Sequence, residues 1–246
     1  MQPRSQNRSL QKIIEEENLC ISRNARGTDK LHPHNYVKEF YEPEFENYKN
    51  RPIDLLEIGF RHGASLYLWH SYFENAQICG ADNSSDAALT EENPINHKWL
   101  SSPNISTFFG DAYDTNFAKK ISKQFDIIID DGPHTISSQI IFLKLYLPKL
   151  KDGGVAIIEV LQDYGALCMW PLMLNTPLKY HVSLLDLRTG SGPHDDLLFV
   201  VRKKGVFPLG NRLIAVAIAV YLSAKEIAVR IFRRAKRNAS HLFSRQ

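Results

Sequence analysis

Short apolar runs alternate with helix-like segments over most of the chain after residue 50. The runs are rich in Ile, Leu, Val and Phe, which is typical of parallel strands buried on both faces. We predict strands at Ile53–Gly59, Gln77–Asp82, Ile105–Gly110, Phe125–Asp130, Val155–Val160, His181–Asp186 and Leu197–Lys203. Helical patterns lie between them around Ser65–Phe73, Ala112–Ser122 and Ser137–Leu150, and Asp152-Gly153-Gly154 is expected to be a loop before the fifth strand. This alternation predicts an α/β, Rossmann-like, doubly wound and mostly parallel sheet with an antiparallel edge pair at its end.

Two flanking segments differ from this pattern. Residues 1–50 are mostly polar with a helical stretch near Leu10–Leu19, and we expect them to form a helical cap or lid. Residues 51–205 hold the predicted sheet, and residues 206–246 read as a basic amphipathic helical tail. At 246 residues the chain has room for one α/β domain with such extensions.

Charge is distributed unevenly between the predicted domain and the tail. Residues 206–246 carry eight Lys or Arg and one Glu, a net +7, so a chain total of +3 leaves −4 for the rest. An acidic body argues against specific nucleic-acid binding by the domain. The apolar half of the tail, followed by its arginines, suggests that Leu213–Arg237 lies in an anionic membrane interface. Packing of that helix on its own domain, or on a partner subunit of a homo-oligomer, is the alternative.

The cysteines and the apolar runs bear on the cellular compartment. Cys20, Cys79 and Cys168 form no C-x-x-C pair, so neither a disulfide framework nor a zinc site is predicted. The first nine residues lack an apolar run, and Leu213–Leu222 is shorter than the roughly 20 residues that span a bilayer. A cytoplasmic location is expected, with peripheral contact to the inner face of the membrane as a further hypothesis.

The loop after the first predicted strand has the pattern E-x-G-x-x-x-G, from Glu57 through Gly59 to Gly63, and Ser65 opens the next helix. Glycines allow a tight turn and a close approach of the backbone to a ligand. The pattern lacks G-x-G-x-x-G and G-K-[ST], and a carboxylate would repel pyrophosphate. It suits a cationic ligand such as a sulfonium with an amino group, although an ordinary strand-turn-helix connection is the plain alternative.

The next two predicted strands end in further carboxylates. Asp82 follows the second strand, where such folds bind ribose hydroxyls, and Asp111 follows the third, beside Ala112. We expect Asp82 to bind ribose, and Asp111 with the Ala112 backbone to contact adenine. Capping of a helix N-terminus is the competing role for each aspartate.

The fourth predicted strand ends in the most specific segment, Asp130-Asp131-Gly132-Pro133-His134. Adjacent carboxylates repel each other unless a cation, hydrogen bonds or a raised pKa relieves them. We therefore expect Asp130 beside the cofactor, and Asp131 and His134 at the catalytic centre, with His134 as general base. Glu159, at the end of the fifth strand, is expected to share a site with Asp131.

Together these motifs resemble the macrocin and mycinamicin sugar O-methyltransferases, over roughly residues 26–165. The shared marks are Gly27-Thr28-Asp29-Lys30 with His34 and Tyr36, Leu56-Glu57-Ile58-Gly59, Ile129-Asp130-Asp131-Gly132 with His134, and Ile158-Glu159 after Gly153-Gly154. The resemblance implies that the segment with Thr28 and Lys30 closes the cofactor site. It also implies Mg²⁺ on Asp131 and Glu159. Where the family has a second acid this chain has Val160, so either Asp163 substitutes or the reaction runs without metal.

The expected function is S-adenosylmethionine-dependent O-methylation of a sugar hydroxyl in a glycan or another small-molecule acceptor, with Mg²⁺ orienting vicinal hydroxyls and His134 accepting the proton. Three alternatives stay open: a metal-independent small-molecule methyltransferase, a non-catalytic protein that keeps the fold, and a relative of the cephalosporin hydroxylase-like proteins.

Overall fold

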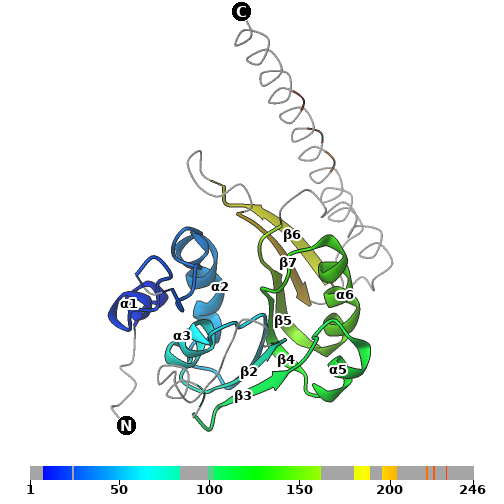
Figure 1. The fold of residues 1–246 in the computed structure, drawn as a ribbon, viewed down its shortest axis with the longest axis horizontal. Helices are drawn as coiled ribbons and strands as arrows, with labels where there is room; N and C mark the ends of the chain where they lie inside the picture. The colour runs from blue at the N-terminus through cyan, green and yellow to red at the C-terminus, as the bar shows by residue number, and fades with distance from the viewer. Residues whose placement is uncertain are drawn as a thin grey trace, which may run out of the picture.

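The computed structural model describes residues 8–23, 25–83, 100, 102–161, 180–188, 196–203 and the single positions 220, 224 and 231. Within them, a sheet with the strand order β3-β2-β1-β4-β5-β7-β6 forms the centre of the molecule (Figure 1). Its strands are β1 (Ile53–Ile58), β2 (Ala76–Asp82), β3 (Ile105–Phe109), β4 (Phe125–Asp130), β5 (Leu150–Ile158), β6 (Tyr180–Asp186) and β7 (Leu197–Lys203). The first five are parallel, and β7 runs antiparallel to both β5 and β6. The predicted fold class and the antiparallel edge pair are confirmed.

Helices cover both faces of the sheet (Figure 1). On one side lie α1 (Leu10–Glu16), η1 (Val37–Tyr41), α2 (Glu42–Phe45), η2 (Glu46–Tyr48) and α3 (Ala64–Tyr72), and on the other lie α5 (Thr115–Lys120), α6 (Ile136–Tyr146) and η3 (Leu147–Lys149). Successive strand residues point to opposite faces, so Leu55 of β1 joins the core on the first side and Leu56 the core on the second. The central strands therefore bury apolar side chains on both faces, and acidic residues occur only near their ends, at Asp54 and Glu57 in β1 and at Asp126 and Asp130 in β4.

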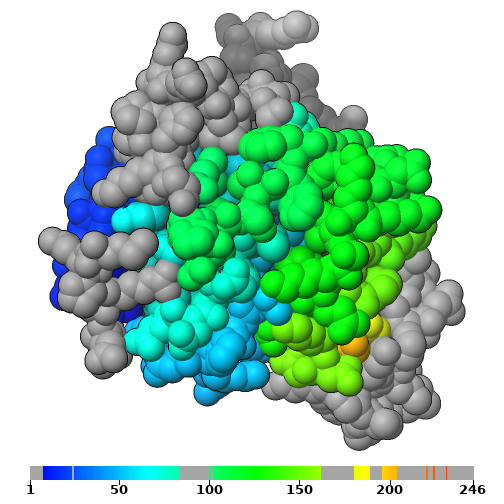
Figure 2. Space-filling view, turned by 90° about the horizontal axis from the view of Figure 1, so that it is seen from below, coloured from blue at the N-terminus to red at the C-terminus, as the bar shows by residue number. Residues whose placement is uncertain are grey.

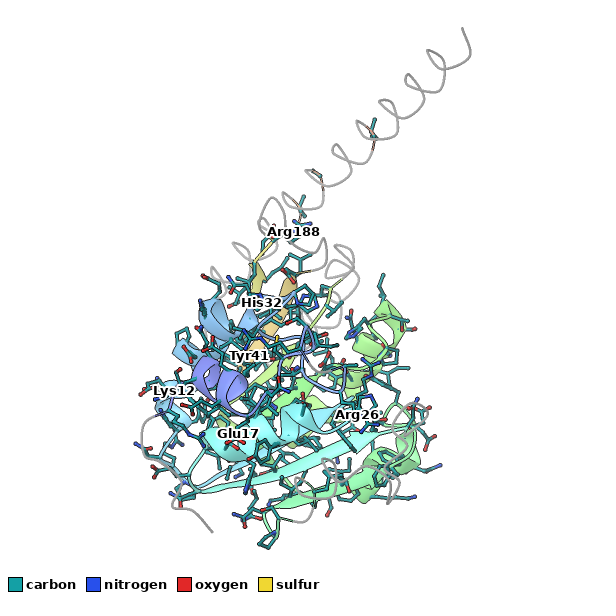
Figure 3. All side chains as sticks on the ribbon, turned by 60° about the vertical axis from the view of Figure 1, so that its left-hand side comes forward. Lys12, Glu17, Arg26, His32, Tyr41 and Arg188 are labelled. Carbon is teal, nitrogen blue, oxygen red and sulfur yellow. The ribbon has the colours of Figure 1, made fainter. Side chains whose placement is uncertain are left out.

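The N-terminal segment shares the core of the sheet rather than lying loosely upon it. The Trp69 ring of α3 packs against Tyr41 and Phe45, with ring centroids 5.1 and 5.5 Å apart. Tyr41 lies in the crowded interior, whereas Lys12 of α1 lies at the surface (Figure 3). Each such aromatic pair adds about 0.5–1.5 kcal/mol beyond its buried area. The segment is thus held firmly against α3.

The prediction of a loop at residues 152–154 is wrong. Asp152-Gly153-Gly154 lies inside β5, which begins at Leu150 instead of Val155. Gly153 has a φ of 82°, and the pairing register with β4 shifts between Phe125 and Ile127, so the strand passes through an irregularity without ending. The glycines mark a bulge here, and the helix before them ends earlier than expected, at Tyr146.

Cyan and green segments, from residues 50–83 and 102–161, adjoin along the face shown in Figure 2.

The tail helix that the sequence predicts over residues 213–237 lies outside the described residues, apart from the three single positions 220, 224 and 231. Among the described helices, none is long and apolar enough to cross a membrane. The proposed membrane contact and the homo-oligomer remain predictions.

Candidate functional site

A cavity of about 470 Å³ opens at the carboxyl ends of β1, β2, β3 and β4. The segment before η1 closes it from one side, through residues 26–29 and Ile21. Its volume falls within the roughly 300–1,000 Å³ of small-molecule sites, and its place is the ligand-binding edge of a doubly wound sheet. The cavity is lined by Ile21, Arg26, Gly27, Thr28, Asp29, Ile58, Gly59, Phe60, Arg61, His62, Ala64, Ser65, Ala81, Asp82, Asn83, Asp111, Ala112, Tyr113, Asp131, Gly132, Pro133 and His134.

Two glycines shape the floor of this cavity. Gly59 has a φ of 86°, and a Cβ there would lie 2.1 Å from the carbonyl oxygen of Asp131. Gly63 has a φ of 84° and stands at the N-terminus of α3. Any other residue would clash or strain the backbone, so both glycines are required by the turn itself. Gly59 lines the cavity, whereas Gly63 supports the turn that leads to its lining residues Ala64 and Ser65.

Asp82, the last residue of β2, and Asp111, on the loop after β3, both line the cavity. An Asp82 oxygen accepts a hydrogen bond from the backbone N–H of Arg61 at 2.8 Å, and Asp111 accepts one from the N–H of Tyr113 at 2.9 Å. The N-cap of the following helix α5 is Asp114, whose side chain accepts from two backbone N–H groups. Asp111 is therefore not a helix cap, and it holds a loop at the cavity wall.

Asp130 lies behind the cavity wall, next to Tyr113. The Tyr113 hydroxyl donates a hydrogen bond of 2.5 Å to this carboxyl group. Burial raises the pKa of Asp130 to about 7, and Asp131 adds to the rise, although the Tyr113 hydrogen bond opposes it. A Cβ on Gly132 would lie 1.9 Å from the Tyr113 oxygen, so this glycine makes room for the pair.

His134 and Asp131 lie together at the cavity wall. His134 has a φ of 56° and directly precedes Thr135, whose side chain caps α6. Its Nε2 lies 3.7 Å from Oδ1 of Asp131, and the two side chains are 25% and 18% exposed. The histidine is thus held beside a carboxylate yet open to a molecule in the cavity, which is the environment of a general base.

Lys30 connects three carboxylates beneath this wall. Its Nζ lies 2.8 Å from Oδ2 of Asp131 and 2.8 and 2.9 Å from the two oxygens of Glu159. Oε1 of Glu57 is 3.4 Å away. The lysine side chain is fully buried, which lowers its pKa, but Asp131, Glu159 and Glu57 raise it, so that its pKa is well above the usual range. Lys30 therefore carries its positive charge at any physiological pH.

Neighbouring donors supply further hydrogen bonds to this cluster, although Oε1 of Glu57 has no hydrogen-bond partner among the described residues. The Tyr41 hydroxyl donates to Glu159, and the Trp69 indole N–H donates to Glu57 at 3.1 Å. Burial raises the pKa of Glu57 above its usual range. Burial, and next the neighbouring Asp131, also raises the pKa of Glu159 well above its usual range, because three acids crowd around one buried ammonium. The stability of the cluster therefore depends on Lys30 and on these donors.

The structure brings most of the predicted site residues to one cavity. Thr28, Gly59, Ser65, Asp82, Asp111, Ala112, Asp131 and His134 line it, whereas Lys30, Glu57, Gly63, Asp130 and Glu159 lie behind these, and Asp163 lies outside the described residues. Sequence reasoning did not single out Arg26, Arg61, His62 and Tyr113, which also line the cavity. The available signal was their position in the sequence. Arg61 and His62 lie between Gly59 and Gly63, Tyr113 lies two residues after Asp111, and Arg26 directly precedes Gly27.

The described residues around Asp131 and Glu159 do not fit a metal ion. Lys30 Nζ already stands at hydrogen-bonding distance from both carboxylates, and Val160 contributes an apolar side chain. Across the described part of the chain, no group of three or more His, Cys, Asp or Glu residues is arranged to hold a metal. A divalent ion would meet the ammonium charge at the same oxygens.

Comparison with known families finds a match for the central part of the sheet domain. Residues 56–159 match the model of a methyltransferase domain family. This segment runs from β1 to the end of β5 and contains most of the cavity lining. This stretch of the chain is therefore similar to a methyltransferase domain, in agreement with what its motifs predicted.

Curated relatives and solved structures agree with this assignment. The chain is 28% identical over 65% of its length to 8-demethyl-8-(2-methoxy-alpha-L-rhamnosyl)-tetracenomycin-C 3'-O-methyltransferase of Streptomyces olivaceus. It is 31% identical over 48% of its length to mycinamicin VI 2''-O-methyltransferase of Micromonospora griseorubida. The chain spans 42% and 30% of the lengths of these two relatives. The expected resemblance to the sugar O-methyltransferases is confirmed.

The fold is shared with a methyltransferase of the mycinamycin biosynthetic pathway, solved in complex with Mg, SAH and mycinamycin VI. The TM-score is 0.60 at 22% identity, over 83% of this chain and 58% of that one. A caffeoyl-CoA O-methyltransferase-like protein from Staphylococcus aureus gives a TM-score of 0.54 at 17% identity, over 80% of this chain and 93% of that one. At these identities the likeness establishes the fold alone.

Proposed function

We propose that this protein transfers a methyl group from S-adenosylmethionine to a hydroxyl group of a sugar in a small-molecule glycoside or glycan. The observation that carries the proposal is the cavity at the carboxyl ends of β1 to β4, which is lined by Gly59, Asp82 and Asp111 together with Asp131 and His134. The methyltransferase domain match and the sugar O-methyltransferases among the relatives support it.

The cavity fits the proposed cofactor. Gly59 lets the turn after β1 pass close to the backbone of Asp131 at the cavity wall, and the lining carries carboxylates that suit a cationic amino acid and ribose hydroxyls. Asp82 is assigned to the ribose, and Asp111 with the Ala112 backbone to the adenine. When bound, S-adenosylmethionine supplies the methyl group. Thr28, in the segment that closes the cavity, lies across from these loops.

His134 is the proposed general base. An acceptor hydroxyl must lose its proton as the new O–C bond forms, and we assign its acceptance to Nε2 of His134, a residue that lines the cavity. Asp131, 3.7 Å from this nitrogen, stabilises the protonated imidazole. The expected Mg²⁺ on Asp131, Glu159 and Asp163 is assigned no step, because the described carboxylates are paired with Lys30.

Calorimetry with S-adenosylmethionine and its demethylated product, against NAD, tests the cofactor assignment. Asp82→Ala should weaken cofactor binding roughly 10- to 100-fold, the effect of removing one hydrogen bond to a charged group. Asp82→Asn keeps an acceptor for Arg61 N–H and should weaken binding less. Asp114→Ala is the matched control, since that aspartate caps α5 and does not line the cavity. Unchanged affinity in a folded Asp82→Ala protein would contradict the ribose assignment.

A transfer assay then tests the acceptor class. Cofactor with a labelled methyl group, incubated with a panel of glycosides, nucleotide sugars and phenols, should label the glycosides. Label on phenols alone would favour the small-molecule methyltransferase alternative. Cofactor binding without transfer to any acceptor would favour a non-catalytic role.

A further inference from the structure

Lys30 stands where two carboxylates at the ends of β4 and β5 converge. Two of its hydrogen-bonding contacts go to both oxygens of Glu159, and another goes to Oδ2 of Asp131. An ammonium group has three N–H donors, so these three contacts use all of them. The side chain is completely buried, so it cannot turn away to solvent while the segment before η1 stays in place.

We propose that the ammonium group of Lys30 is a built-in cation that takes the place of a divalent metal between Asp131 and Glu159, so that the protein works without one. This rests on the proposed function. The proposal addresses a disagreement: the sequence motifs implied a metal ion on Asp131 and Glu159, whereas in the structure both carboxylates contact Lys30.

The contacts favour the lysine over a metal at this position. Nitrogen to oxygen distances of 2.8 and 2.9 Å are those of charge-assisted hydrogen bonds. Mg²⁺ needs oxygen ligands at roughly 2.0–2.1 Å in an octahedron, and the lysine nitrogen occupies the space between the same oxygens. A metal would therefore have to displace a fully buried side chain.

Lys30 also has a positioning role toward the base. It holds Oδ2 of Asp131, and the other oxygen of that carboxylate faces Nε2 of His134 at 3.7 Å. Glu159 anchors Lys30 in turn, and Tyr41 donates a hydrogen bond to Glu159. Polar contacts thus connect the buried Tyr41 to His134 at the cavity wall, through Glu159, Lys30 and Asp131.

Titration with Mn²⁺ on the full chain, after treatment with a chelator, tests the proposal by paramagnetic resonance. The wild type should hold no Mn²⁺ in the range where metal-dependent enzymes bind it. Lys30→Ala should bind Mn²⁺ roughly tenfold or more tightly, because two carboxylates lose their cation and a space opens between them. Adding Glu159→Gln to that variant should remove the gain. Lys151→Ala, which also frees two carboxylates from a lysine, is the matched control and should gain no comparable site.

One equivalent of Mn²⁺ bound by the wild type and lost in Glu159→Gln would overturn the proposal. So would a folded Lys30→Ala protein that binds no Mn²⁺. If Lys30→Ala does not fold, the wild type decides: methyl transfer unaffected by chelator supports the proposal, and transfer lost and restored by Mg²⁺ overturns it. Mn²⁺ binding is read without any transfer, so failure of the proposed function shows separately, as absent cofactor binding.

Discussion

Lysine–carboxylate ion pairs lie at both ends of the central strands, but they differ in how deeply they are buried. At the amino ends of β1 and β4, Lys151 lies 2.7 Å from both Asp54 and Asp126, and Lys123 also pairs with Asp54. At the carboxyl ends, Lys30 pairs with Glu57, Asp131 and Glu159. The side chain of Lys151 is 34% exposed, whereas that of Lys30 is not exposed at all.

The difference in burial separates a structural role from a functional one. At the amino ends water screens the charges, and the two lysines lower the pKa of Asp54 although burial raises it. At the carboxyl ends three acids share one buried ammonium, an arrangement with a high desolvation cost. A folded protein keeps such a cluster where the charges serve a neighbouring site, and here the cavity with His134 adjoins it.

The largest expected effect is on turnover at the carboxyl edge. His134→Ala should lower the rate of methyl transfer by about 10²- to 10⁴-fold, the usual contribution of a positioned general base, and leave cofactor affinity nearly unchanged. Single-turnover kinetics with saturating cofactor measures it. Lys151→Ala, at the amino edge, is the control and should keep the wild-type rate. Full activity in His134→Ala would show that the histidine is only a loop residue, and Asp131 would then be the base candidate.

The second prediction compares the two lysines directly. Lys30→Met should lower the free energy of unfolding by about 3–5 kcal/mol, because it leaves buried carboxylates without their cation. Lys151→Met should lower it by about 1 kcal/mol or less, since its partners are reached by water. Urea denaturation of both variants at neutral pH measures the difference. Equal losses would contradict the distinction between the two edges.

The third prediction concerns pH. The pKa of Asp130 rises from 3.8 to about 7 on folding. Between pH 3.8 and about pH 7, the folded state therefore keeps a proton on this carboxyl group that the unfolded state has lost. Its contribution to stability is complete below pH 4 and is lost as pH rises through 7. By linkage the loss is on the order of 4 kcal/mol. Asp130→Asn should remove that part of the pH dependence while still accepting the Tyr113 hydrogen bond. Denaturation of cofactor-free protein from pH 4 to 8 tests it, and parallel curves for both proteins would refute the shift.

Local sequence was enough to predict the sheet and the position of the site. Apolar runs predicted the strands because a strand buried on both faces admits few polar residues. The acids at or just after the carboxyl ends of β1, β2, β3 and β4 had to gather at one edge of a parallel sheet. The bulge in β5 was missed because glycine permits both a loop and an irregular strand, and only pairing with β4 separates the two.

Tertiary structure alone decided the ionic partners. Lys30 meets Asp131 and Glu159 across 101 and 129 residues, and His34 pairs with Asp196 across 162. The motif containing Lys30 predicted a closed cavity, but no spacing reveals which carboxylates an ammonium reaches once a segment folds over the sheet. The sequence by itself determined which charged residues lie at the carboxyl edge of the sheet, because the apolar runs show where each strand ends. Their pairing and burial depend on long-range packing, and only the tertiary structure shows that Lys30 reaches Asp131 and Glu159.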